Sequence, residues 1–326
     1  MKTSSRRILL VFTVLAAPVF GQSDRPVRVS LVKMPYVGER NVPDRSNGPD
    51  SLEQGGIQKI LEESGCRTKP AAAVVLTAEE QKAYGEWNRL GLANGALARV
   101  VGDERREGYF PIGLLANCSA LPGMLSGLQH SGATARPLRV GLVFIDAHGD
   151  FNTPETTLSG MLGGMPVAIA AGRCLTRLRL LSGLEPALPE RHIVLGAVRD
   201  TDPLEQDLLD RSEIQHLSVA DIRSRSDALE HQMKRLSSLT DVIYVHVDMD
   251  VLDPREVPGH PLTVAGGPTS LELGAALTEM FRYEKAVAFG VASTPWGERD
   301  REGVSRKAAY NLIQGVVKGL ERRGTR

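Results

Sequence analysis

The sequence predicts an α/β protein, a single-domain three-layer α/β/α sandwich with a mainly parallel central sheet. Short apolar runs that are typical of buried strands, such as 140–145 and 242–247, recur along the chain. Segments with helix-capping signals separate these runs, as they do in repeated βαβ units. The length of 326 residues and the apolar content of 42% suffice for one large core, and no repeat or linker divides the chain.

Capping residues and turn residues bound each element of the first half. Residues 25–34 alternate apolar and polar side chains and predict the first strand, which a loop rich in proline and glycine follows. Thr77 caps a long helix with Glu79 and Glu80 in its first turn. Strands are therefore expected over 25–34, 72–76 and 109–115, and helices over about 50–64, 77–101 and 121–130.

The second half continues the alternation. Pro203 fits the first position of a helix with Asp202 as its cap, and Thr269 caps another helix. Strands are expected over 140–145, 193–198, 242–247 and 286–293, and helices over about 165–171, 203 onward, 218–236, 269–283 and 306–322. Strands that alternate with helices in this way favour a parallel sheet with helices on both faces.

The apolar run 140–145 leads into Asp146, His148 and Asp150. In an extended chain this i, i+2, i+4 spacing directs the three side chains to one side. Two carboxylates and an imidazole that converge at the end of a buried strand would repel one another or lose their hydration. A divalent metal ion resolves the conflict, and a pair of ions resolves it better.

A second apolar run, 242–247, leads into Asp248 and Asp250. One Asp-x-Asp by itself is more often a solvated turn. Two such motifs, each behind an apolar run, favour a metal site, because sites in open α/β sheets form beyond the carboxyl ends of the strands.

Residues 1–21 have the parts of a signal peptide: basic residues, an apolar stretch over 8–19, and a cleavage site before Gln22. A short membrane anchor is the alternative, but the stretch is short for a span. We therefore expect export, to a periplasm or outside the cell, and a mature catalytic domain over 25–326. Lys plus Arg equals Asp plus Glu at 39 each, and this balance argues against a nucleic-acid partner.

The cysteines are Cys66, Cys118 and Cys174. An odd and sparse set does not make a disulfide framework, although one pair could bridge in an oxidising compartment.

With these motifs in view, the chain resembles the arginase–agmatinase–formiminoglutamase family, the ureohydrolases, from about residue 27 to 320. The most specific part is Asp-Ala-His-Gly-Asp-Phe-Asn-Thr-Pro at 146–154, which continues through 156–160. Further parts are Asp-Met-Asp-Val-Leu-Asp-Pro at 248–254 and the segment 196–205.

The resemblance implies two divalent ions, manganese in the family, with Asp146 and Asp248 bridging them. It implies metal ligands at Asp146, His148, Asp150, Asp248 and Asp250. The two metal ions would activate a hydroxide that attacks a guanidinium or formimino carbon. Asp150 would be the catalytic residue that also orients this hydroxide.

Asn152, Ser159 and Asp202 match positions that hold the amino-acid end of the substrate in arginases. Each residue could instead have a purely structural role: Asn152 in a turn, Ser159 in a loop and Asp202 as a helix cap. The resemblance also implies a small-molecule substrate and a homotrimer or homohexamer.

Three positions depart from the family. Cys118 stands where the sixth ligand is a histidine, and its thiolate could bind zinc, iron, cobalt or nickel in place of manganese. Gly163 stands where arginases have a proposed proton-shuttle histidine. Ser293 replaces the glutamate that pairs with the guanidinium, and a serine cannot neutralise that cation.

These observations predict a dinuclear metal hydrolase that cleaves a C–N bond in a guanidino, formimino or related linear amidine or amide substrate. We expect that the enzyme is not an arginase itself. The alternative is a secreted, non-catalytic relative that binds metal or a small molecule.

Overall fold

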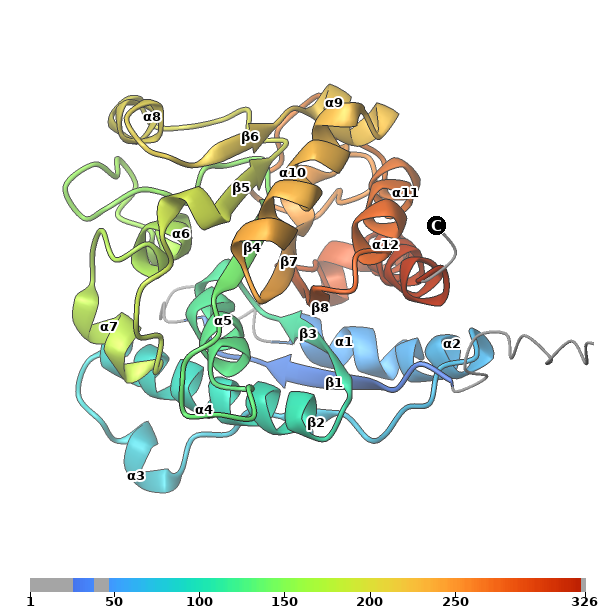
Figure 1. Cartoon of the computed structure of the whole chain (residues 1–326), viewed down its shortest axis with the longest axis horizontal. Helices are drawn as coiled ribbons and strands as arrows, with labels where there is room; N and C mark the ends of the chain where they lie inside the picture. The colour runs from blue at the N-terminus through green and yellow to red at the C-terminus, as the bar shows by residue number, and fades with distance from the viewer. Residues whose placement is uncertain (1–25, 38–46, 324–326) are drawn as a thin grey trace, which may run out of the picture.

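The computed structural model describes residues 26–37 and 47–323, so the predicted signal peptide lies outside the described residues. Eight strands form one sheet in the order β2-β1-β3-β8-β7-β4-β5-β6, and every pair is parallel (Figure 1). The strands are β1 (Val29–Met34), β2 (Ala72–Ala73), β3 (Phe110–Leu115), β4 (Val140–Ile145), β5 (Ile193–Gly196), β6 (Gln215–Leu217), β7 (Val242–Asp248) and β8 (Ala286–Ala292).

Helices cover both faces of this sheet, which confirms the predicted three-layer α/β/α fold. One buried apolar cluster joins the sheet to α4 to α7, and a second joins it to α1, α2 and α9 to α12. The helices are α1 (Gly48–Gln54), α2 (Ile57–Glu63), α3 (Ala78–Gln81), α4 (Glu86–Arg106), α5 (Leu121–Gln129), α6 (Pro166–Ala170), α7 (Thr176–Leu181), α8 (Pro203–Asp210), α9 (Val219–Ser224), α10 (Asp227–Leu239), α11 (Ser270–Phe281) and α12 (Val304–Glu321).

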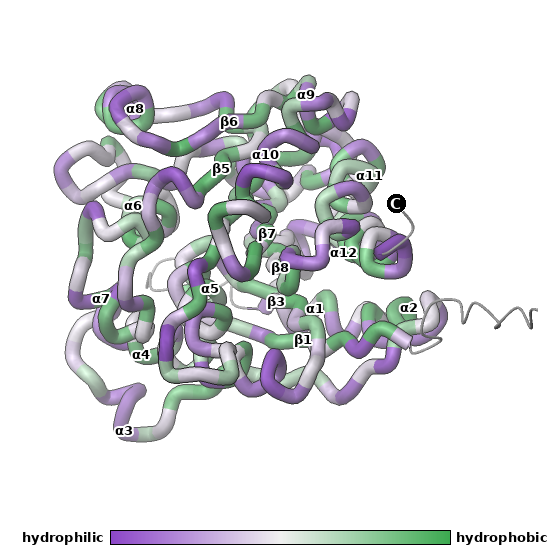
Figure 2. Tube along the Cα trace, viewed as in Figure 1, coloured by the Kyte–Doolittle hydropathy of each residue, from purple (hydrophilic) through white to green (hydrophobic). Residues whose placement is uncertain are grey.

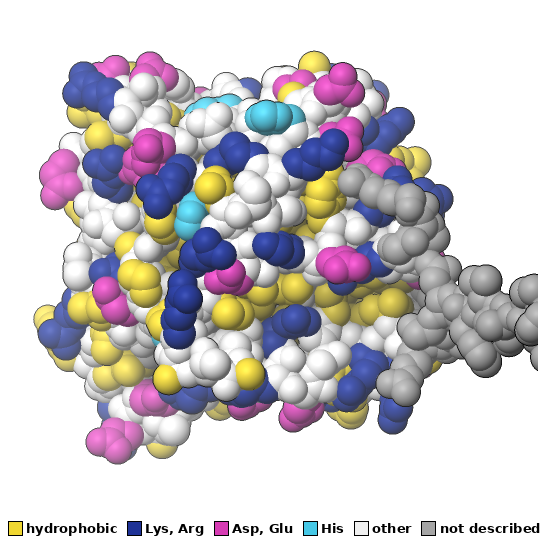
Figure 3. Space-filling model, viewed as in Figure 1, with side chains coloured by type: hydrophobic (Ala, Val, Ile, Leu, Met, Phe, Trp, Pro, Cys, Tyr) yellow, Lys and Arg dark blue, Asp and Glu magenta, His cyan; other side chains and the backbone are white. Residues whose placement is uncertain are grey.

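The hydrophobic effect explains this layering. Every residue of β3, β4, β7 and β8 is buried, because these central strands have helices on both sides. Figure 2 shows the same pattern, with hydrophobic stretches along the central strands. On the face drawn in Figure 3, basic and acidic side chains both occur. Among the described helices, none combines the length and the apolar character that a membrane span needs.

Three predicted helices are each two helices. The helix expected over 50–64 breaks at Gly56, the one over 77–101 near Gly85, and the one over 218–236 at Arg225. All three residues have positive φ angles, of 97°, 87° and 53°, which a continuing right-handed helix does not allow. The capping boxes at Thr77 and Thr269 are confirmed. Strand β6 and helix α7 were not predicted, because β6 is short and polar and α7 has no side-chain cap.

Candidate metal centre

The order of the central strands brings the predicted site residues to one edge of the sheet. Strands β3, β8, β7 and β4 are consecutive neighbours, and all are parallel. Cys118 follows β3, Ser293 follows β8, Asp248 ends β7 and Asp146 follows β4. Four side chains that lie far apart in the sequence therefore meet beyond the carboxyl ends of these strands, as expected for a parallel sheet.

Three overlapping groups of side chains could each hold a metal ion, and the ligand atoms within each group lie within 4.8 Å of one another. The groups are Cys118 with Asp146 and Asp248, Asp146 with His148 and Asp250, and Asp248 with Asp250 and His260. Asp146, Asp248 and Asp250 each belong to two groups, so each of these carboxylates lies where two ion positions could share it. Asp150 belongs to none of the three groups, but it lines the same cavity as Asp146, Asp248 and Asp250.

The backbone around Asp150 is not the extended chain that the sequence suggested. Strand β4 ends before Asp146, and Asp150 has a φ of 49°. The Asp150 carbonyl accepts a hydrogen bond from the Val167 N–H at 3.0 Å, and the Phe151 N–H donates to Glu205 at 2.8 Å. A side chain at Gly149 would lie 2.7 Å from the same Glu205 carboxylate. Glu205 and α6 therefore hold Asp150 in a tight turn that carries its carboxylate toward the site.

A second turn places Asp250. Its backbone N–H donates to Asp248 Oδ1 at 3.1 Å, so the first aspartate of the motif caps the turn that carries the second. Arg199, which follows β5, donates to the carbonyl of Val251 at 3.1 Å and to that of Val264 at 2.9 Å. Arg199 thus ties this turn to the loop beyond it.

The cluster carries more buried negative charge than its own residues neutralise. Burial, followed by the charges of Asp146 and Asp248, raises the pKa of Asp150 well above its usual range, and the same causes raise the pKa of Asp250. Burial opposes a charge on His148, yet the hydrogen bonds that its ring donates to Asp146 and Asp250 raise the pKa of this imidazole to about 12. A divalent cation is the group that would relieve this repulsion.

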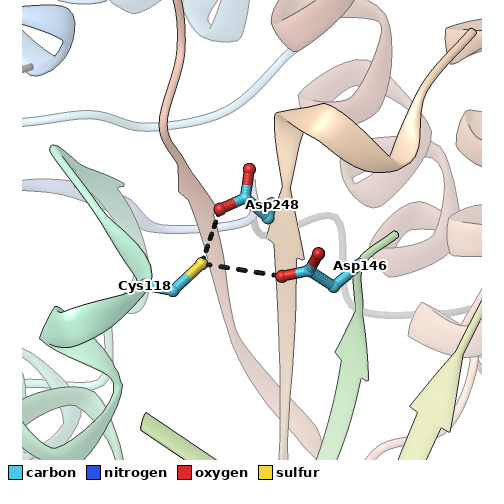
Figure 4. Close-up of side chains that lie close together, drawn as sticks. All are labelled: Cys118, Asp146 and Asp248. Carbon is cyan, nitrogen blue, oxygen red and sulfur yellow. Dashed lines mark hydrogen bonds between the residues drawn. The ribbon is translucent and has the colours of Figure 1, made fainter. Parts of the chain in front are cut away.

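Cys118 points into the same cluster (Figure 4). Its Sγ donates to Asp248 Oδ2 at 2.7 Å and lies 3.9 Å from Asp146 Oδ2. All three cysteines are free thiols, so Cys118 is not half of a disulfide, as predicted. In the metal-free protein the pKa of the Cys118 thiol lies well above its usual range. Burial and the nearby carboxylates raise this pKa, because a three-residue turn offers little opposing charge.

A cavity of about 250 Å³ opens onto the cluster. Asn152 Nδ2 donates to Asp202 Oδ2 at 3.2 Å, and the Leu158 N–H donates to the same oxygen at 3.0 Å. Asp202 therefore holds the loop that forms one wall, besides standing at the start of α8. Ser159 is exposed at the mouth. The predicted substrate residues that line this cavity are Asn152, Ser159, Asp202 and Ser293.

Ser293 is buried and has a φ of 61°. Its Oγ donates to Asp248 Oδ2 at 2.7 Å. Ser293, which was predicted to contact the substrate, thus lines the cavity and also contacts the candidate metal ligand Asp248.

Sequence reasoning missed two histidines. His260 is buried in the cavity wall, with Nε2 3.8 Å from Asp248 Oδ1 and Nδ1 4.0 Å from Asp250 Oδ2. His246 lies within β7, and its Nε2 is 3.2 Å from Cys118 Sγ. A single histidine in a Gly-His-Pro loop has no ligand spacing, and one inside an apolar strand resembles a core residue, so neither gave a signal.

The sequence profile of the arginase family matches residues 28–313. The chain belongs to the arginase family. It is 28% identical over 279 residues to the arginase of Brevibacillus brevis, a match that spans 82% of this chain and 90% of that protein. It is 29% identical over 258 residues to human mitochondrial arginase-2, which spans 75% of this chain and 71% of the relative. This arginase-family protein is therefore a hydrolase of the class that acts on C–N bonds in linear amidines.

Solved structures of the arginase family share the fold. The arginase of Bacillus subtilis aligns with a TM-score of 0.77 at 23% identity, covering 89% of this chain and 98% of that one. The formimidoylglutamase of the same species aligns with a TM-score of 0.69 at 16% identity, covering 93% and 89%. The family uses two divalent ions, and the clustered aspartates, histidines and cysteine of this chain could hold them.

Proposed function

We propose that this arginase-family hydrolase holds two divalent ions and cleaves a C–N bond in a guanidino, formimino or related linear amidine or amide other than arginine. The observation that carries the proposal is the convergence of one thiol, two imidazoles and the carboxylates at the buried end of a cavity. The proposed ligands are Cys118, Asp146, His148, Asp150, Asp248 and Asp250.

The donor set fits such ions. Carboxylates and an imidazole suit manganese, the ion expected from the family, while a thiolate shifts selectivity toward zinc, iron, cobalt or nickel. The raised pKa values of Asp150 and Asp250 support a cation as well, because without one burial and the charges of Asp146 and Asp248 oppose their ionisation.

When bound, the ions supply a water of lowered pKa and polarise the scissile group. The protein's own residues do the rest. Asp150 would accept a hydrogen bond from the attacking water and orient it. The Leu262 N–H donates to His260 Nδ1 at 3.3 Å, which leaves the proton of a neutral ring on Nε2, the nitrogen nearer to Asp248. His260 is therefore a donor toward the cavity.

The substrate side argues against arginine. Ser293 has no charge to pair with a guanidinium, and its hydroxyl is engaged with Asp248. Gly163 lines the cavity but can move no proton. We infer a substrate whose reacting group is less cationic, or whose cation pairs with another acid. A non-catalytic role is less well supported, because the cavity joins the buried Asp248 to the exposed Ser159.

Two further expectations stay proposals. Export through residues 1–21 follows from the sequence pattern. A homotrimer or homohexamer follows from the family resemblance.

The test is metal analysis of the purified protein, followed by screening of guanidino, formimino and ureido compounds for release of ammonia or urea. Two ions per chain and turnover of one compound class are expected, with both lost in Asp248→Asn. Asp253→Asn is the matched control, because Asp253 lies just beyond the motif and pairs with Arg255 at the surface. Full turnover by metal-free protein would refute the proposal, and so would two bound ions without turnover of any compound.

A further inference from the structure

Two polar side chains lie buried behind Cys118 on strand β7. Tyr244 and His246 are two residues apart, and neither is accessible to solvent. The Tyr244 hydroxyl lies 2.9 Å from His246 Nδ1, and His246 Nε2 lies 3.2 Å from Cys118 Sγ. The three groups form a hydrogen-bonded chain that runs from the core of the sheet to the candidate metal centre.

The direction of this chain follows from its donors and acceptors. Within the described part of the chain, the Tyr244 hydroxyl bonds to His246 Nδ1 and to no other group. A buried hydroxyl needs an acceptor for its proton, so the Tyr244 hydroxyl donates to Nδ1 of His246. The ring proton is then on Nε2, and His246 donates it to Cys118 Sγ.

The surrounding sheet fixes both rings. Phe144 is the register partner of His246 on β4, and their rings stack 4.9 Å apart at an angle of 6°. Gly290 is the register partner of His246 on β8, and a Cβ there would lie 2.0 Å from the Tyr244 hydroxyl. The absence of a side chain at Gly290 therefore makes room for this hydroxyl. The stacked Phe144 ring and the hydrogen bond with Tyr244 therefore restrict rotation of the imidazole.

We propose that Tyr244 and His246 are positioning residues that orient Sγ of Cys118 as a metal ligand. The inference rests on the metal site proposed above. A bound cation would displace the thiol proton, which now points to Asp248, and the N–H of His246 would continue to donate to the sulfur. A donor behind a ligand atom fixes its direction and offsets part of its charge, and removal of such partners costs 10–100-fold in metal affinity.

The test uses the whole protein, stripped of metal and titrated with Co²⁺. A thiolate ligand produces a sulfur-to-cobalt charge-transfer band, which reports on Cys118 without any turnover. His246→Phe keeps a ring that can stack on Phe144 but lacks the donor, and we expect it to weaken the Co²⁺ step that carries this band by about 10–100-fold. Tyr244→Phe frees the ring to adopt the other tautomer, so a smaller loss is expected. His246→Gln restores an N–H and should recover part of the affinity.

Tyr310→Phe is the matched control, because it removes a mostly buried tyrosine hydroxyl that donates to the Leu52 carbonyl at 2.7 Å, away from the site. Urea unfolding shows whether each variant is folded. If His246→Phe is unstable, Tyr244→Phe still tests the inference, because it keeps the buried ring and removes only the hydroxyl. Unchanged Co²⁺ affinity and band in folded Tyr244→Phe and His246→Phe would overturn this inference and leave the proposed function intact. Two Co²⁺ ions without the band would exclude Cys118 as a ligand and also overturn it. A wild-type protein that binds no Co²⁺ would overturn both proposals.

Discussion

Removal of the metal should make the stability of this protein fall as the pH rises from about 7 to about 8.5. The cause is the excess of negative charge at the candidate centre. Burial and neighbouring carboxylates raise the folded-state pKa values of Asp150 and Asp250 above the unfolded value of about 4. His148 has a folded-state pKa of about 12, against about 6.5 in the unfolded chain.

The sign of the effect follows from these shifts. The contribution of each raised group is fully present below its unfolded pKa and is lost as the pH rises through its folded pKa. Between about pH 7 and 8.5 the folded, metal-free chain therefore holds more protons at this site than the unfolded chain does. Each extra proton changes the free energy of unfolding by about 1.4 kcal/mol per pH unit. The extra proton on His148 alone gives a loss of about 2 kcal/mol over this range, and any proton held by Asp150 or Asp250 adds to it in the same direction.

Bound ions should remove this slope, because the aspartates then stay ionised and His148 stays neutral. The assay is urea unfolding at about pH 7 and 8.5, with chelator or with excess divalent metal. Urea is preferable to guanidinium, which resembles a substrate of the family. His192 and His216, whose pKa values burial lowers, act in the opposite direction only below about pH 6.5. Cys66 and Cys174 contribute equally to the pH dependence of stability with and without metal. The informative quantity is therefore the difference between the stability measured with chelator and with excess metal at each pH.

Asp250→Asn removes one of the clustered carboxylates and should reduce the slope of the metal-free protein. Asp241→Asn is its control, because Asp241 pairs with Arg139 on the surface and its pKa of about 2 lies far from the range studied. Equal slopes with and without metal, or metal-free stability that rises with pH, would refute the electrostatic reasoning.

Three further predictions concern the substrate side and one concerns the amino terminus. The wild-type protein should turn over arginine far more slowly than a typical kcat of about 10 s⁻¹. Ser293→Glu should tighten guanidinium binding, measured by inhibition, because a missing charge partner costs about 2–5 kcal/mol. His260→Ala should keep both ions yet lose about 100-fold in kcat, and loss of an ion would make His260 a ligand instead. Asp202→Ala should free the loop at 153–161 and lower kcat/KM by about 10–100-fold with unchanged metal content, since hydrogen bonds to a charge contribute about 1.5–3 kcal/mol. The exported protein should begin at Gln22 by mass spectrometry, and an intact leader would contradict the export prediction.

The sequence alone determined the class of fold and the edge of the sheet where the site lies. Apolar runs long enough for strands, separated by capped helices, leave few arrangements other than a parallel sheet. Aspartates directly after two such runs must then lie at its carboxyl edge. Asp146 and Asp248 were located in this way, since Asp146 directly follows a strand, Asp248 is the last residue of one, and their places depend on local geometry.

Only the tertiary structure decided how the remaining groups point. Asp150 reaches the site through a left-handed turn that Glu205 holds from another helix, not through the extended chain that its spacing suggested. His246 and His260 enter the centre through contacts with residues distant in sequence or across a loop, and no local pattern predicts these contacts. The direction of a side chain in a turn or a buried strand depends on what packs against it, and long-range contacts that sequence spacing does not record supply that packing.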